Sequence, residues 1–127
     1  MEELRHRQWW LLIGYGLIGA VIYLSLTSKP VIIDIGFDFA DKINHFLAYA
    51  TLMAWFGMIF QRVRPRFQWG LGFVAMGVML EILQGLGGVR YFDYADMVAN
   101  AIGVAIGAIL VLTPLRYLLH RAERLWS

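Results

Sequence analysis

The chain has 127 residues, of which 60% are hydrophobic and only 16% are charged, and it contains no cysteine. A soluble domain typically has about 25% charged residues, so this composition argues against a soluble protein. The net charge of +2 argues against nucleic-acid binding, and the lack of cysteine excludes disulfides and thiolate chemistry. No polar linker divides residues 1–127, so we expect a single membrane domain.

Four apolar stretches each come close to the roughly 20 residues that a helix needs to cross a bilayer. They lie at about residues 9–26, 43–60, 67–86 and 95–113. The first contains 18 uncharged residues, more than the usual signal-peptide core of about 7–15, and no A-x-A-like cleavage site follows it. We therefore interpret it as an uncleaved signal anchor. The sequence predicts an all-α fold, a bundle of four transmembrane helices.

The basic residues predict the orientation of this bundle. Three of them fall on one side of the predicted membrane: Lys29, Lys42 and Arg90. Eight fall on the other side: Arg5, Arg7, Arg62, Arg64, Arg66, Arg116, Arg121 and Arg124. Because Lys and Arg are enriched in cytoplasmic loops, we expect both termini in the cytoplasm. Four of the tryptophans lie near the same boundary, as an aromatic belt would place them: Trp9, Trp10, Trp69 and Trp126.

Two further patterns concern helix packing. After Pro114, leucines recur on one face of a predicted helix and arginines lie elsewhere, which fits either an amphipathic tail on the inner leaflet or a continuation of the fourth span. Gly103 and Gly107 form a G-x-x-x-G step, which lets helix backbones approach closely in lipid. The step could join two copies of the chain, but in a four-span protein we favour packing within one chain.

Polar residues near the outer ends of three spans are the candidates for function. A charged group at a helix centre costs about 2.5–3.5 kcal/mol on insertion scales, so such residues need an explanation. The second span begins with Asp41, Lys42, His45 and Tyr49, which follow one another at helical spacing. The third span and the region after it contribute five more: Glu81, Gln84, Arg90, Asp96 and Asn100.

Each of these residues also has a structural explanation. Asp41 and Asp96 could cap helices, and Glu81 could be protonated or paired with Arg90 or Lys42. However, residues from three spans lie at the same outer level, and convergence of this kind is what a site requires. We therefore predict a single polar site that opens to the outer face.

The same residues resemble a known family. Residues 41–49 (DKINHFLAY) resemble the D-K-x-x-H-F-x-x-Y signature of the VanZ-like membrane proteins. Glu81, Gln84, Arg90, Asp96 and Asn100, followed by Gly103 and Gly107, resemble that family's E-x-x-Q…R…D-x-x-x-N-x-x-G-x-x-x-G run. The resemblance implies a four-span protein of the bacterial cytoplasmic (inner) membrane. The founding member is associated with low-level resistance to teicoplanin, which acts outside the membrane on peptidoglycan precursors.

Three functions fit these observations. In the first, the site binds an anionic lipid head group or a lipid-linked envelope precursor through Arg90, Lys42 and His45. In the second, the chain is a small intramembrane enzyme of the lipid phosphate hydrolase or transferase type. His45, Glu81 and Asp96 would then be catalytic, with Mg²⁺ or Mn²⁺ as the cation that suits such a carboxylate-rich set. The third is proton or ion transport through Glu81.

Overall fold

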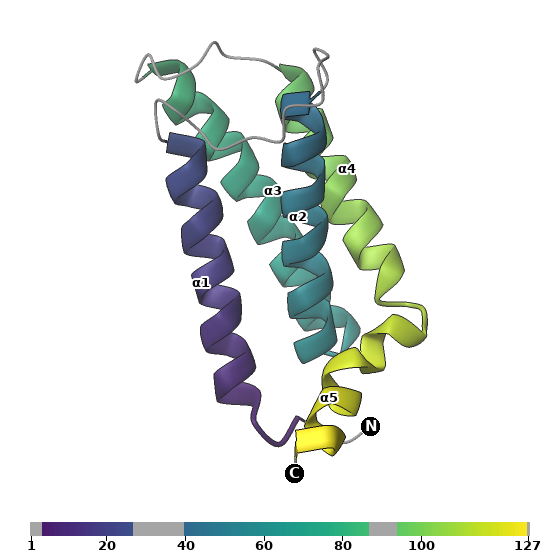
Figure 1. Ribbon diagram of the computed structural model, residues 1–127. Coiled ribbons are helices and arrows are strands. Elements are labelled where there is room, and N and C mark those ends of the chain that lie inside the picture. Colours follow the sequence, from purple (N-terminus) through teal and green to yellow (C-terminus); the bar gives the residue numbers. More distant parts are fainter. Residues whose placement is uncertain (1–3, 27–39, 87–93, 127) are drawn as a thin grey trace.

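The fold was examined in a computed structural model, which describes residues 4–26, 40–86 and 94–126. All the regular structure in these residues is helical (Figure 1). The elements are α1 (Arg7–Leu26), α2 (Ala40–Ile59), α3 (Val63–Leu86), α4 (Tyr94–Leu110), the 3₁₀-helix η1 (Pro114–Tyr117) and α5 (Leu118–Trp126). The predicted all-α class is thus confirmed.

Helices α1 to α4 alternate in direction along a common axis, so that both termini lie at the same end of the bundle (Figure 1). We call this the terminal end and the opposite one the far end. Helix α2 contacts the three other long helices and has its closest partner in α4. Its side chains Leu52, Met53 and Phe56 form the core together with Phe73 of α3 and Val104 of α4.

The outer surface of the bundle is apolar, as expected for a membrane protein. Large hydrophobic side chains such as Leu12, Leu71, Met79 and Val98 are exposed along the helices. By length and hydropathy, α1 and α3 can each cross a membrane. A third candidate combines α4 with the η1–α5 segment, but these are bent by 75° relative to each other. The described residues thus support two to three spans on this criterion.

Two helix boundaries differ from the predicted spans. Helix α3 begins at Val63, ahead of the predicted start of the span at about residue 67, so Arg64 and Arg66 lie in its first turn. Pro65 is tolerated there because the first turn of a helix needs no internal N–H donor. Helix α4 ends at Leu110, and Thr113 then caps η1 by accepting a hydrogen bond from the Leu115 backbone N–H at 3.2 Å.

The G-x-x-x-G step of α4 packs against α2. A Cβ atom built on Gly103 would lie 2.5 Å from the carbonyl oxygen of Phe46, and one built on Gly107 would lie 2.5 Å from that of Ala50. Only glycine permits backbones to approach this closely. The small-residue face of α4 is therefore covered by α2 of the same chain.

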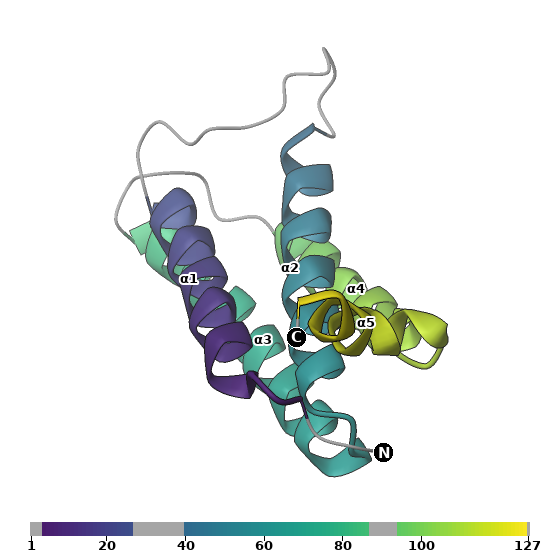
Figure 2. The ribbon, with the colours of Figure 1, turned by 60° about the horizontal axis from the view of Figure 1, so that its bottom comes forward.

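The two ends of the chain are joined by Glu123 of α5. Its carboxylate accepts hydrogen bonds from the backbone N–H groups of Arg5 and His6, at 2.8 and 2.7 Å, and from the Trp10 indole at 2.8 Å. We call these four residues the terminal clasp. Helix α5 turns across the terminal end of the bundle, where Leu119 is buried with residues of α2 (Figure 2).

The terminal clasp should make the stability of the folded protein depend on pH. Burial alone would raise the pKa of Glu123, but the three N–H donors outweigh this effect and lower it. A carboxyl with a lowered pKa stabilises the folded state above the usual glutamate value of about 4.3, and this stability is lost as the pH falls through the lower, folded value. Glu123→Gln is expected to cost about 1–3 kcal/mol at pH 7 and to make unfolding less pH-dependent below pH ~4.

Thermal unfolding of the detergent-solubilised protein between pH 3 and 7, followed by total tryptophan fluorescence, would measure this. Arg124→Gln, on the exposed side of α5, is the matched control and should leave the acid limb unchanged. An identical acid limb in Glu123→Gln and in the unmodified chain would contradict the prediction.

Candidate functional site

Buried polar side chains gather near the far end of the bundle, inside an otherwise apolar interior. Glu81 and Gln84 on α3 are each 1% exposed, while Asp96 and Asn100 on α4 are 4% and 3% exposed. Helix α2 adds a buried tyrosine and a partly buried histidine. We call this set the polar layer; its members are His45, Tyr49, Glu81, Gln84, Asp96 and Asn100.

Asn100 connects three helices of the polar layer. The Nδ1 atom of His45 lies 3.0 Å from the Asn100 amide oxygen. Because an amide oxygen only accepts hydrogen bonds, this contact requires the tautomer in which Nδ1 of His45 is the donor. The amide of Asn100 also packs against α3 at Gly77, where an added Cβ would lie 3.0 Å from Nδ2.

The two acids of the polar layer lie one helical turn further toward the far end. Glu81 is four residues after Gly77, so it lies on the face of α3 that meets Asn100. Asp96 is four residues before Asn100 and shares its face of α4. Glu81 also lies near enough to Tyr49 for the two side chains to interact electrostatically. Side chains of α2, α3 and α4 thus meet at one level.

Gln84 links this level to α1. Its Nε2 donates to the carbonyl oxygen of Ser25, in the last turn of α1. Its Oε1 is buried and accepts no hydrogen bond within the described residues. A buried acceptor of this kind normally has a partner, so Gln84 offers an acceptor to a ligand, a water or a segment not described.

Some predicted site residues cannot be placed in this way. Asp41 and Lys42 lie in the first turn of α2, but their side chains are outside the described part, as is Arg90 entirely. Asp96 lies within the first turn of α4 rather than before it. A carboxylate in the first turn is stabilised by the helix dipole, which supplies part of the structural explanation for this residue.

A metal site finds no support in residues 4–26, 40–86 and 94–126, because these hold no group of three or more His, Cys, Asp or Glu able to bind one ion. The suggestion of Mg²⁺ or Mn²⁺ therefore stays a prediction.

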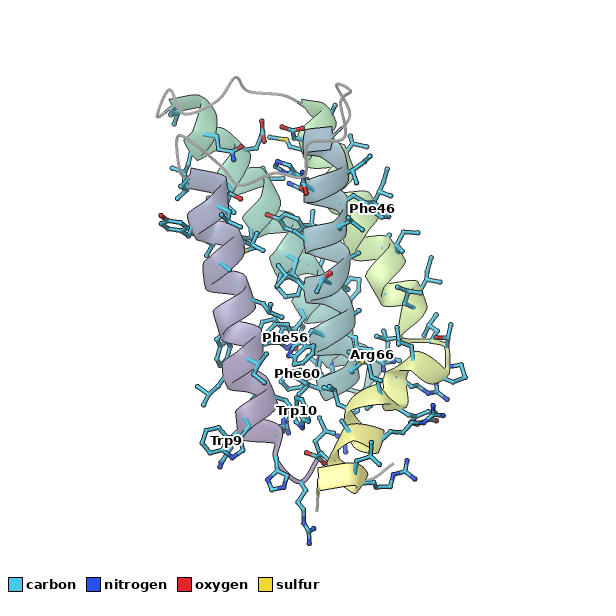
Figure 3. The ribbon with its side chains drawn as sticks, in the orientation of Figure 1. Trp9, Trp10, Phe46, Phe56, Phe60 and Arg66 are labelled. Carbon is cyan, nitrogen blue, oxygen red and sulfur yellow. The ribbon has the colours of Figure 1, made fainter. Side chains whose placement is uncertain are left out.

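The structure also shows polar contacts at the terminal end that sequence reasoning missed. Arg66 donates from Nε and Nη2 to the carbonyl oxygen of Gly57, at 3.0 and 2.8 Å, and from Nη2 to Oε1 of Gln61 at 2.8 Å. Gln61 donates in turn to the backbone oxygens of Met58 and Arg116, each at 2.8 Å. Figure 3 shows Arg66 and Phe60 near this end. From the sequence, Arg66 and Arg116 predicted only the orientation of the bundle in the membrane.

The sequence was compared with models of known protein families. The family model described as VanZ/LLP1 matches residues 4–118, which is most of the chain. The chain belongs to the VanZ/LLP1 family. This confirms the resemblance seen in the sequence, and VanZ itself is linked to teicoplanin resistance. The polar layer lies inside the VanZ/LLP1 match, whereas His120 and Glu123 lie beyond it. No curated protein and no solved structure gives a significant match.

Proposed function

We propose that this VanZ/LLP1 protein crosses the bacterial cytoplasmic membrane four times, with both termini in the cytoplasm. Two observations support this topology. The four long helices alternate in direction, and α2 is packed between helices that can themselves span (Figure 1). The eight arginines counted as cytoplasmic all belong to segments at the terminal end. The far end, which carries the polar layer, then faces outward.

The polar layer, in this proposal, binds the anionic head group of a lipid or a lipid-linked envelope precursor. The observation that carries it is the burial of four polar side chains from α3 and α4 next to His45, inside an apolar bundle. Such residues are expensive to place in a membrane unless they have a role. Nε2 of His45 can contact a phosphate, while the carboxylates and amides can accept hydrogen bonds from head-group hydroxyls. Lys42 and Arg90 are further phosphate ligands expected from the sequence.

One contact favours a second candidate, an enzyme acting on such a lipid. The hydrogen bond to Asn100 orients the imidazole of His45. An oriented histidine close to buried acids is an arrangement that general acid–base catalysis uses. His45 would then transfer the proton, and Glu81 or Asp96 would position the attacked group. The same residues would serve binding and catalysis.

Transport receives less support. Between the polar layer and the terminal end, the described core consists of apolar side chains, including Leu52, Met53, Phe56, Phe73 and Val104. A proton or ion pathway needs polar groups or water along its length. The described interior offers neither a buried acid nor a buried base over this stretch, so the proposal is a site at one face.

A binding measurement tests the proposal. Purified full-length protein in a neutral detergent should bind a polyprenyl phosphate saturably, and His45→Ala should weaken that binding by roughly tenfold, as loss of one charge-assisted phosphate contact predicts. His6→Ala, at the terminal end, is the matched control and should bind normally. Equal binding by His45→Ala and the unmodified protein would contradict the proposal.

The same experiment separates binder from enzyme. If the protein converts the lipid, product analysis will show turnover that His45→Ala abolishes while the helical content stays unchanged. A pure binder will return the lipid unaltered and will lose only affinity.

A further inference from the structure

A second polar site lies at the terminal end, on the opposite side of the bundle from the polar layer. It is a pocket of about 790 Å³, within the range of about 300–1,000 Å³ typical of small-molecule sites. The described lining contains no carboxylate. Four of its residues are basic: Arg7, Arg62, Arg116 and His120. They come from α1, the α2–α3 connection, η1 and α5, so the folded chain brings them together. We call this site the basic pocket.

Aromatic rings contact two of the arginines in the basic pocket. The Arg7 guanidinium lies over the ring of Phe60, 4.5 Å from its centroid, and that of Arg116 lies over Tyr117 at 4.8 Å. Phe60 stacks in turn on Trp69, which also lines the pocket. Cation–π contacts restrict a guanidinium but leave its N–H groups able to bind an anion. The Nε atom of Arg116 is buried and donates no hydrogen bond within the described part of the chain.

The surroundings keep the pocket positive and rigid. Arg66 donates hydrogen bonds to the carbonyl oxygen of Gly57 and to the lining residue Gln61. Its positive charge interacts electrostatically with that of Arg116. The one described acid at this end is Glu123, whose carboxylate already accepts three hydrogen bonds in the terminal clasp. Gln61 fixes η1 to α2 through the Arg116 carbonyl oxygen. The cationic side chains are therefore positioned before any ligand arrives.

We propose that the basic pocket binds a phosphate group, the anion that arginine side chains recognise best. Arginine's planar N–H donors match phosphate oxygens, and several converging arginines distinguish a phosphate site from scattered surface charge. The pocket lies at the level of the tryptophans that mark the membrane boundary, where phospholipid head groups lie. This site is distinct from the polar layer and goes beyond its proposed function.

The phosphate could belong to an anionic lipid or to a free phosphate compound, and one titration distinguishes them. Full-length protein in a neutral detergent would be titrated with dioctanoyl-phosphatidylglycerol and, separately, with sodium phosphate, and binding would be followed by isothermal titration calorimetry. Saturable binding of the lipid alone identifies a head-group site, and equal binding of phosphate identifies a free-phosphate site. Binding of neither probe would overturn the proposal, as would equal binding of dioctanoylglycerol, which has the same acyl chains but no phosphate.

Two pairs of arginine variants test whether the phosphate binds in the basic pocket. Arg62→Gln with Arg116→Gln should weaken it roughly tenfold or more, since each arginine contributes a charge-assisted contact. Arg121→Gln with Arg124→Gln removes the same charge from exposed positions outside the lining, and should change it less than about twofold. Equal loss in both pairs would overturn the proposal.

Two further variants complete the test. If the first pair fails to fold, Arg62→Gln alone, at an exposed position, carries the test and should still weaken binding. The loss caused by the arginine variants should be the same in a His45→Ala background, so that failure here and failure of the polar-layer proposal are separable.

Discussion

Replacing Gly107 or Gly103 by alanine is expected to destabilise the protein more than any other single-methyl change in the bundle. The new Cβ would lie 2.5 Å from a backbone oxygen of α2, which cannot rotate away as a side chain could. Overpacking of this kind costs about 1–3 kcal/mol or more, which exceeds the roughly 1 kcal/mol that alanine gains over glycine in a helix. Both variants should melt at lower temperature in detergent, and the double variant should fail to accumulate.

The chain supplies its own control for this experiment. Gly16 and Gly72 lie in helices where an added Cβ meets nothing within 4 Å. The same substitution there should be neutral or slightly stabilising. If all four alanine variants melted alike, the close packing of α4 on α2 would not be the cause.

Removing the charge of Glu81 is expected to have the second large effect. A carboxylate that is 1% exposed in an apolar bundle needs a cationic or donor partner or must be protonated. From the sequence we expect Arg90 to be that partner. Removing one member of a buried pair costs about 3–5 kcal/mol, because the other charge is left uncompensated. Glu81→Gln and Arg90→Gln should each cost this much in unfolding free energy.

A double-mutant cycle tests the pairing directly. If the two residues pair, the double variant will be less destabilised than the sum of the two single variants. Lys42→Gln is the matched control, because Lys42 is the alternative cation in the same region. Coupling of Glu81 with Lys42 instead, or strict additivity with Arg90, would rule out the predicted pair.

Much of the fold could be predicted because long apolar stretches leave few choices. In a membrane the backbone must satisfy its hydrogen bonds internally, so an uninterrupted apolar stretch predicts a helix. The helical class followed from this. The ends were harder to predict: α3 begins at Val63 rather than at about residue 67, and Pro65 lies in its first turn because proline is compatible with a helix start as well as with a turn. The four-span topology and its orientation stay predictions.

The polar layer was accessible from the sequence for a related reason. Glu81, Asp96 and Asn100 stand out against apolar neighbours, and their helical spacing predicted a common level, although the role of that level is untested. Their individual contacts were not accessible, since Gln84 bonds to α1 and His45 to Asn100 through the packing of separate helices. Glu123 was missed because an acid among arginines in a polar tail looks like an ordinary solvated residue. The available signal was that Glu123 is the one acid in the segment from Pro114 to Ser127.

The terminal clasp has a consequence for the order in which the protein is completed during synthesis. The donors in Arg5, His6 and Trp10 leave the ribosome before their acceptor, Glu123, and all the long helices are translated between them. The segment before α1 therefore lacks its Glu123 acceptor while α2, α3 and α4 are translated. The terminal clasp therefore cannot form until α5 has been translated, so a polypeptide that stops before α5 would contain every long helix and still lack the contact that joins α5 to α1.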